Sequence, residues 1–307
     1  MNSCLLCRAP VGLKMTMPVD SQTLKPTRHG AVYHCVACAV GFVLPRPTPD
    51  ETVAFYDIDY YTHAVAPERV QRGFWSRVKT NLAWRVDKGE AMADIIAKSL
   101  QPDSSIVDLG CGAGDLLREL AARSYRMTGV ERDTSALAFN DPSITVMQGS
   151  VESPPSDLLP GFDGVVFSHV MEHLVDPVAA MRFAASLLKP GGLLFCEVPN
   201  NESIVAERSR LTWHHLDIPR HVNFFTERSL STLVQLAALT PQRSYFAGYC
   251  RSFADAYLTT ERRIFSALAK PDGSIEHTPA ASWRLLTLTM FARPQRKYDS
   301  VGIVARL

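Results

Sequence analysis

The chain lacks a long hydrophobic run, an excess of either charge, and any internal repeat or low-complexity segment. Its longest late apolar stretch, 285–292, is broken by threonines and is too short to cross a bilayer. The formal net charge is +1, which argues against a nucleic-acid partner attracted by overall charge. The N-terminus also lacks the basic flank and apolar core of a secretion signal. We therefore expect a cytoplasmic protein without a membrane span.

The chain does contain enough apolar sequence for one large domain and a smaller appendage. It has 307 residues, 46% of them hydrophobic. The segment 106–114, IVDLGCGAG, predicts a buried strand and a glycine-rich turn, followed by a helix from about 115 to 123. Glycines allow a tight turn and a close approach of the backbone to a ligand. This strand-turn-helix is typical of the nucleotide-binding half of a doubly wound α/β sheet.

The spacing of the glycines separates two classes of cofactor. A dinucleotide fingerprint that started at Gly110 would need glycine or alanine at position 115, where the chain has Asp115. The sequence instead places an aspartate two residues before a G-x-G-x-G loop: Asp108, Gly110, Gly112 and Gly114. The next predicted strand, 126–131, ends in Glu131, and an acid at that strand end can accept hydrogen bonds from ribose hydroxyls.

Further strands and turns follow in a regular order. A third strand, 144–147, precedes Ser150 and Val151, and a fourth, 162–168, ends at Ser168. His169-Val-Met-Glu172-His173-Leu comes next, and then Leu187-Leu-Lys-Pro-Gly-Gly192 as the turn into a fifth strand, 193–198, before Pro199-Asn200. Because these strands are almost wholly apolar, we expect them to be buried on both faces of a parallel sheet.

Together these motifs resemble those of class I S-adenosylmethionine-dependent methyltransferases. The resemblance implies an α/β fold with a doubly wound, Rossmann-like, seven-stranded sheet, and S-adenosylmethionine as cofactor. Ser150 stands where the family often has an aspartate for the exocyclic amine of adenine, and backbone groups can serve there instead. The cofactor-binding residues that the resemblance implies are Asp108, Gly110, Gly112, Gly114, Glu131, Ser150, Val151 and Ser168.

The seven cysteines are unevenly distributed, and four of them form two C-x-x-C pairs: Cys4, Cys7, Cys35 and Cys38. Two close thiolate pairs can form a tetrahedral structural zinc site. A disulfide framework fits poorly with the absence of an export signal, and a thioredoxin-like role would need a βαβ context. His34 is an alternative ligand beside Cys35. The remaining cysteines, at 111, 196 and 250, are expected to be small core residues.

The chain begins with the cysteine-containing ribbon, which is followed by a proline-rich linker at 44–49, a tyrosine-rich segment at 55–61 and the catalytic core. This order resembles that of a bacterial group of zinc-ribbon methyltransferases. Members of that group often act on sugars or other secondary-metabolite scaffolds, and in sugar C-methyltransferases a tyrosine and a His/Glu pair assist the chemistry. Here Tyr60 and Tyr61 are the candidate tyrosines. The predicted organisation is a ribbon and linker at 1–48, a helical lead-in at 49–100, a core at 101–249, an insertion at 250–299 and a last strand at 300–307.

After Asn200 the sequence departs from the minimal core. Residues 213–225 are rich in histidine and aromatics and directly follow the fifth strand, so we expect them to face the substrate. A helix from Thr226, its N-cap, to Leu239 and strands at 242–249 and 300–305 are predicted next. The insertion between those strands is a candidate cap over the pocket or a contact in a homodimer.

The predicted reaction is methyl transfer to oxygen or carbon of a small-molecule acceptor. Histidine and carboxylate side chains suit removal of a proton from the acceptor, and the candidates are His169, Glu172, His173 and His221. His221 also neighbours Arg220, a pair suited to a phosphate or carboxylate. Two alternatives remain open: an RNA methyltransferase that binds RNA through the ribbon, and a degenerate fold that serves as an interaction module.

Overall fold

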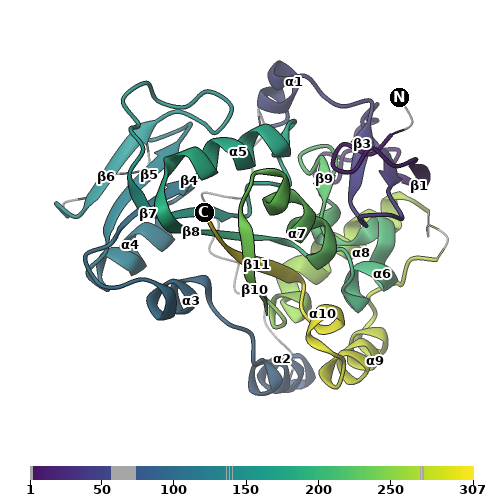
Figure 1. The fold of residues 1–307 in the computed structure, drawn as a ribbon. Helices are drawn as coiled ribbons and strands as arrows, with labels where there is room; N and C mark the ends of the chain where they lie inside the picture. The colour runs from purple at the N-terminus through teal and green to yellow at the C-terminus, as the bar shows by residue number, and fades with distance from the viewer. Residues whose placement is uncertain are drawn as a thin grey trace.

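The computed structural model of the protein describes residues 3–56, 74–135, 137, 139, 141–269, 271 and 273–307. Its centre is a seven-stranded sheet of order β10-β11-β8-β7-β4-β5-β6 (Figure 1). Neighbouring strands are parallel from β8 through β6, whereas β11 runs antiparallel to both β10 and β8. The strands are β4 (Ser105–Leu109), β5 (Arg126–Glu131), β6 (Ile144–Gln148), β7 (Phe162–Ser168), β8 (Leu188–Pro199), β10 (Thr240–Ala247) and β11 (Ser300–Arg306). The predicted doubly wound sheet is confirmed.

Helices cover both faces of the sheet because successive strand residues point to opposite sides. In β4, Ile106 packs in one core with α3 (Met92–Ser99) and α4 (Asp115–Ala121). Its neighbour Val107 packs in another core with α5 (Pro177–Leu187) and α7 (Glu227–Leu236). Figure 1 shows α5 and α7 in front of the sheet. This arrangement leaves the carboxyl ends of the parallel strands at one edge, where their loops meet.

Several predicted boundaries were inexact. The described part of the predicted lead-in at 49–100 includes α2 (Phe74–Val86) and α3, which are separated by residues 87–91. β8 begins at Leu188 and includes residues 189–192, which were predicted to form a turn. The pairing of β8 with β7 is irregular at this point. The helix capped by Thr226 is confirmed as α7, with a capping box, but it ends at Leu236. Tyr60 and Tyr61 lie outside the described residues.

The N-terminal ribbon is a small antiparallel sheet that the core completes. Its strands are β1 (Gly12–Thr16), β2 (Ala31–His34) and β3 (Gly41–Leu44). The fourth strand is β9 (Asn223–Phe224), which comes from the late histidine-rich segment and pairs with β3. The proline-rich stretch is packed rather than free, since the Arg46 guanidinium donates to the carbonyl oxygens of Val222, Leu174 and Val175. The ribbon and the core are therefore one continuous structure.

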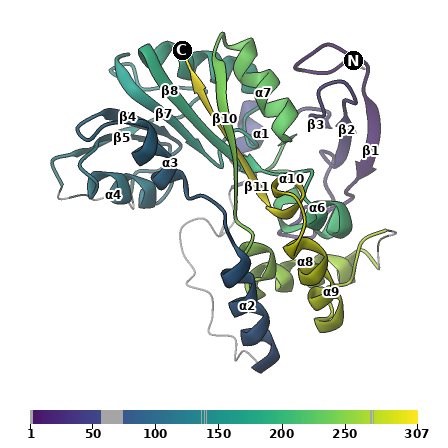
Figure 2. The ribbon, with the colours of Figure 1, turned by 60° about the horizontal axis from the view of Figure 1, so that its bottom comes forward.

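The insertion and the segment after β8 form a helical layer beside the sheet (Figure 2). Within this layer α8 packs against η1, η2 and η3, and the layer contacts the lead-in helix α2 through α9 and η3. No described helix is both long and apolar enough to cross a membrane. The elements of the layer are α6 (Ile204–Ser209), η1 (Arg210–Thr212), η2 (His214–Leu216), η3 (Arg251–Phe253), α8 (Asp255–Ala267), α9 (Pro279–Met290) and α10 (Pro294–Lys297); α1 (Pro49–Ala54) follows the ribbon.

Candidate functional site

The glycine loop between β4 and α4 has a backbone that only glycine adopts easily. Gly110, Gly112 and Gly114 have φ angles of +83°, +52° and +75°, in the left-handed region. A Cβ atom at position 110 would lie 2.8 Å from Cγ2 of Val170, in the loop after β7. The glycines therefore allow the shape of this turn and let it pack against the loop that follows β7.

Two carboxylates lie at the ends of the adjacent strands β4 and β5. Glu131 is held by the backbone: its Oε2 accepts from the N–H of Gly112 at 2.9 Å and its Oε1 from the N–H of Arg132 at 2.7 Å. Asp108 is 1% exposed, and its Oδ1 has no hydrogen-bond partner among the described residues. Burial, together with repulsion from Glu131, raises the pKa of Asp108 to about 7. A buried, unpartnered acid beside a second acid favours a cationic ligand.

The remaining predicted cofactor residues are placed at the same edge of the sheet. Ser168 is the last residue of β7, in register with Glu197 of β8. Val151 is buried in the loop after β6. The Ser150 hydroxyl accepts the N–H of Ser153 at 3.0 Å, so this side chain is engaged in its own turn.

His169 lies between two carboxylates directly after β7. Its backbone has a positive φ of 56°, and its N–H donates to the carbonyl oxygen of Glu197 at 2.9 Å. Its Nδ1 lies 3.3 Å from Oε1 of Glu172, and its Nε2 lies 3.3 Å from Oε1 of Glu197. Burial alone would lower the pKa of His169, but Glu172 and Glu197 raise it to about 9.

The structure brings the other three predicted proton-transfer candidates together with His169. Ligand-type atoms of Glu172, His173 and His221 lie within 4.8 Å of one another. Although burial opposes ionisation, the neighbouring His169 and His173 hold the pKa of Glu172 at about 2. His221 donates from Nδ1 to the carbonyl oxygen of His215 at 2.7 Å, and burial lowers its pKa to about 4. His221 is therefore neutral at physiological pH, with Nε2 as its proton-accepting nitrogen.

His173 connects this cluster to the N-terminal part of the chain. Its Nδ1 lies 2.8 Å from the hydroxyl of Tyr56 and 3.1 Å from the carbonyl oxygen of Arg220. Its ring lies edge-on to that of His221, with the centroids 4.6 Å apart. We name the four residues His169, Glu172, His173 and His221 the reaction cluster.

Arg220 has a different place from the one suggested by its position next to His221. Its side chain is fully buried, and Nη2 lies 2.7 Å from Oδ1 of Asp20 and 3.1 Å from Oδ1 of Asp217. The expected pairing of Arg220 with His221 around a substrate phosphate or carboxylate is therefore corrected. This arginine joins the ribbon to the segment that carries His221.

A second layer of polar residues lies beside the reaction cluster, and it includes His214 and His215 of the histidine-rich segment. Nη2 of Arg251 lies 3.4 Å from Oδ1 of Asp299, and both residues belong to the insertion. Glu261 of α8 lies 2.8 Å from Nδ1 of His214 and 2.5 Å from Nε2 of His277. Ligand-type atoms of His214, His215 and Asp299 also lie within 4.8 Å of one another, but Arg251 already supplies positive charge there. Of this layer, the histidine-rich segment 213–225 was predicted to face the substrate, whereas Arg251, Glu261 and Asp299 were not singled out in the sequence.

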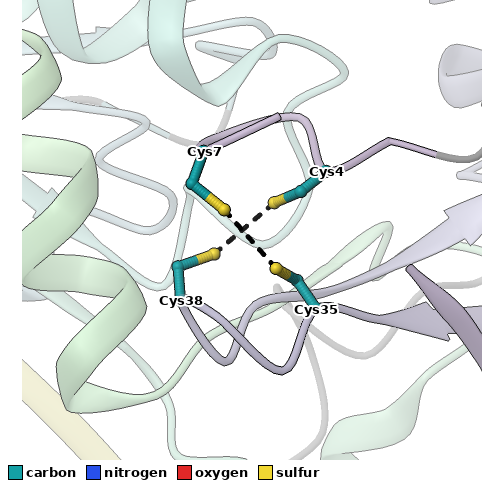
Figure 3. A group of neighbouring side chains, drawn as sticks. All are labelled: Cys4, Cys7, Cys35 and Cys38. Atoms are coloured by element: carbon teal, nitrogen blue, oxygen red, sulfur yellow. Dashed lines mark hydrogen bonds between the residues drawn. The ribbon is translucent and has the colours of Figure 1, made fainter. Parts of the chain in front are cut away.

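The four ribbon cysteines converge from two loops on one point (Figure 3). The Sγ atoms of Cys4 and Cys38 lie 3.4 Å apart, and those of Cys7 and Cys35 lie 3.5 Å apart. A tetrahedron with Zn–S bonds of about 2.3 Å has sulfur atoms roughly 3.8 Å apart, close to these values. His34 is not among the grouped ligand atoms. The cluster is therefore compatible with zinc.

The two cysteine loops also share one backbone pattern. The N–H of Cys4 donates to the carbonyl oxygen of Ala9 at 2.7 Å, and the N–H of Cys35 donates to the carbonyl oxygen of Val40 at 2.9 Å. The residue after each second cysteine, Arg8 or Ala39, has a φ angle of +64° or +63°. Two loops of the same geometry that face each other are compatible with one tetrahedral ion. Cys111, Cys196 and Cys250 are buried, as expected for core residues.

Comparison with known proteins agrees with this geometry. A family model described as a methyltransferase domain matches residues 79–242. The chain is 29% identical over 150 residues to the ubiquinone biosynthesis O-methyltransferase of Colwellia psychrerythraea, covering 45% of this chain and 54% of that protein. It is 32% identical over 113 residues to the protein of the same description from Xanthomonas campestris, covering 34% and 47%. The chain thus spans about half the length of the curated relatives it matches.

A solved structure shows the same fold. It is the complex between the Trm112 methyltransferase activator and a putative methyltransferase from Haloferax volcanii, with a TM-score of 0.50 and 17% identity. The match covers 76% of this chain and 93% of that chain, and at this identity it speaks for the fold alone. With a family model that matches more than half of the sequence, the chain belongs to the class I S-adenosylmethionine-dependent methyltransferase family.

Proposed function

We propose that the protein is an S-adenosylmethionine-dependent methyltransferase that acts on an oxygen atom of a small-molecule acceptor. The observation that carries the proposal is the pair of carboxylates, Asp108 and Glu131, at adjacent strand ends around an intact glycine loop. The names of the curated relatives, which are O-methyltransferases of ubiquinone biosynthesis, favour oxygen over carbon. A sugar or another secondary-metabolite scaffold stays a candidate acceptor class.

The residues at the strand ends suit the parts of S-adenosylmethionine. Glu131 would accept hydrogen bonds from the ribose hydroxyls, and it would give up some of its bonds to backbone amides in exchange. Asp108 would face the cationic amino group, directly or through water, which would supply the partner that its Oδ1 lacks. The glycine loop allows the close approach of the ligand. The sulfonium methyl group is already activated, so the protein's main tasks are positioning and exclusion of water.

The reaction cluster would prepare the acceptor. A hydroxyl proton must leave as the acceptor oxygen forms its bond to the methyl carbon, while the carbon–sulfur bond breaks and its electrons remain on sulfur. His169, Glu172 and His173 lie directly after β7, and His221, from the segment before β9, is grouped with Glu172 and His173. Val170, in the loop after β7, lies against the glycine loop. Proton acceptors therefore lie beside the cofactor edge of the sheet, in a mostly buried environment.

We further propose that Cys4, Cys7, Cys35 and Cys38 hold one structural zinc ion. The ribbon is a short segment whose buried residues pack in clusters shared with the rest of the protein, so the metal would supply folding energy rather than chemistry. The ribbon contacts the segment that carries His221 through Asp20, which pairs with Arg220, and Tyr56, after α1, contacts His173. Zinc would thereby stabilise the acceptor side of the active site.

The test is methyl transfer from labelled S-adenosylmethionine to a panel of phenols, catechols and sugar nucleotides. We expect label in at least one acceptor, with product mass and hydrolysis behaviour that identify an O-methyl group. At subsaturating S-adenosylmethionine, Glu131→Ala should lower the transfer rate about tenfold or more. Glu119→Ala, at an exposed glutamate on α4, should leave the rate unchanged. Label that appears only in RNA, or a product with a new carbon–carbon bond, would contradict the proposed acceptor oxygen.

A further inference from the structure

The Nε2 atom of His169 faces two groups of opposite hydrogen-bonding character. Oε1 of Glu197, at 3.3 Å, can only accept a hydrogen bond. Nη1 of Arg251, at 3.4 Å, can only donate one. A protonated Nε2 therefore has Glu197 as its partner, and an unprotonated Nε2 has Arg251. Both protonation states of the ring have a partner at the same nitrogen without any movement of the backbone.

We propose that Glu197 and Arg251 are a positioning pair that enables His169 to accept the acceptor's proton at Nε2 and to release it afterwards. The inference rests on the proposed function and deepens it, since it selects one residue of the reaction cluster. In the step itself, the acceptor O–H bond breaks and an Nε2–H bond forms. The hydrogen bond of His169 then passes from Arg251 to Glu197. The released proton leaves to solvent after the product departs.

The insertion holds Arg251 in place from the opposite side of the cluster. Arg251 lies in η3, and its Nη2 donates to the hydroxyl of Ser300 at 2.5 Å. The same nitrogen lies 3.4 Å from Oδ1 of the fully buried Asp299 and 3.7 Å from Oε1 of Glu197. A Cβ atom at Gly248 would come within 2.2 Å of Nη2, so the glycine leaves room for the guanidinium. Arg251 is thus fixed in its position toward His169.

The charges around His169 set how tightly its ring holds a proton. Glu172, in the same segment, and Glu197, on β8, both favour the imidazolium. Arg251, on η3, is the positive group that opposes them, and Asp299 partly neutralises it. His215, on η2, stacks on His169 with the ring centroids 6.1 Å apart, and burial lowers the pKa of His215 well below its usual value. With Arg251 absent, two carboxylates would face His169 and hold its proton.

The test is the titration of His169 followed by NMR in the full-length, zinc-loaded protein with labelled histidine. The His169 signal is identified by its loss in His169→Gln. Arg251→Met should raise the pKa of His169 by about 1 or more, since a charge within 4 Å is removed, and Glu197→Gln should lower it. Arg251→Lys keeps the charge and should restore most of the wild-type value. Arg228→Met, at an exposed position on α7, is the matched control and should have no effect.

An unchanged His169 pKa in Arg251→Met would overturn the proposal, because a merely structural arginine would not tune the ring. If Arg251→Met does not fold, the His169 pKa in Glu197→Gln and Arg251→Lys decides instead. An unchanged pKa in Glu197→Gln would then overturn the proposal. The activity readout is separate: methyl transfer should rise with pH toward about 9, where His169 loses its proton, and Arg251→Met should move that rise to higher pH. A protein that shows the predicted pKa shifts but no methyl transfer would refute the proposed function and leave the positioning pair intact.

Discussion

The carboxyl ends of the parallel strands form one edge of the sheet, and the two halves of this edge are built differently. At the ends of β4 and β5, Asp108 and Glu131 lie close in sequence, and backbone amides hold Glu131. At the ends of β7 and β8, the charged groups come from separate segments, from His169 and Glu197 in the core to Arg251 in the insertion. We infer that the cofactor half is a local motif, whereas the acceptor half depends on tertiary contacts.

The ribbon belongs with the acceptor half in this comparison. Its strand β3 pairs with β9, directly after His221, and Asp20 forms an ion pair with the buried Arg220. Changes in the ribbon should therefore affect turnover far more than cofactor binding. The following predictions test whether the two halves can be separated in this way.

The largest effect is expected from loss of zinc. Cys38→Ser should release the metal, unfold the ribbon and remove Asp20 from Arg220. Loss of this buried ion pair should displace the segment that carries His221, and misplacement of a reacting group can lower turnover by about a hundredfold or more. Affinity for S-adenosylmethionine, measured by calorimetry, should change less than about twofold because its binding groups are local. Equal losses in both measurements would show that the halves are not independent.

Removal of the ribose acceptor should have the converse effect. Glu131→Ala should weaken S-adenosylmethionine binding at least about tenfold, or about 1.4 kcal/mol, by loss of charge-assisted hydrogen bonds. The NMR titration of His169 should be unaltered in this variant. Glu119→Ala serves as the control, since its carboxylate only pairs with Arg123 at the surface. An affinity equal to that of the wild type would refute the ribose role.

Cofactor affinity should depend on pH through Asp108. Its pKa is raised to about 7, above the usual value for aspartate, by burial and by Glu131. A cationic ligand binds the ionised form, so affinity should fall as the pH drops below about 7, by up to about tenfold per pH unit. Binding near pH 6 should release a proton, which calorimetry in buffers of different ionisation enthalpy detects. In Asp108→Asn this dependence should vanish, and its persistence would assign the proton to another group.

The smallest effect is expected at Ser150. Its hydroxyl accepts a hydrogen bond within its own turn, so Ser150→Ala should change cofactor affinity less than about twofold. A tenfold loss in the same titration would show that the hydroxyl turns toward the ligand on binding. That result would restore the side-chain contact with adenine that the family pattern suggests at this position.

The success of sequence reasoning follows the same division. The glycine loop, Glu131 and the cysteine pairs are short-range patterns with a direct physical meaning, and the structure has the predicted geometry at each. β9 was missed because a two-residue strand is recognisable only through its partner β3. Arg251 gave no signal, because its role depends on contacts with His169 and Asp299, both distant in sequence.

The central claim is that the glycine loop, Asp108 and Glu131 bind S-adenosylmethionine, and calorimetric titration into the purified, zinc-loaded protein tests it most directly. The account predicts saturable binding of both S-adenosylmethionine and S-adenosylhomocysteine in the micromolar range, since both carry the ribose and the amino group that the two acids recognise. No detectable binding of either ligand, in a protein that is folded and carries its metal, would contradict the account.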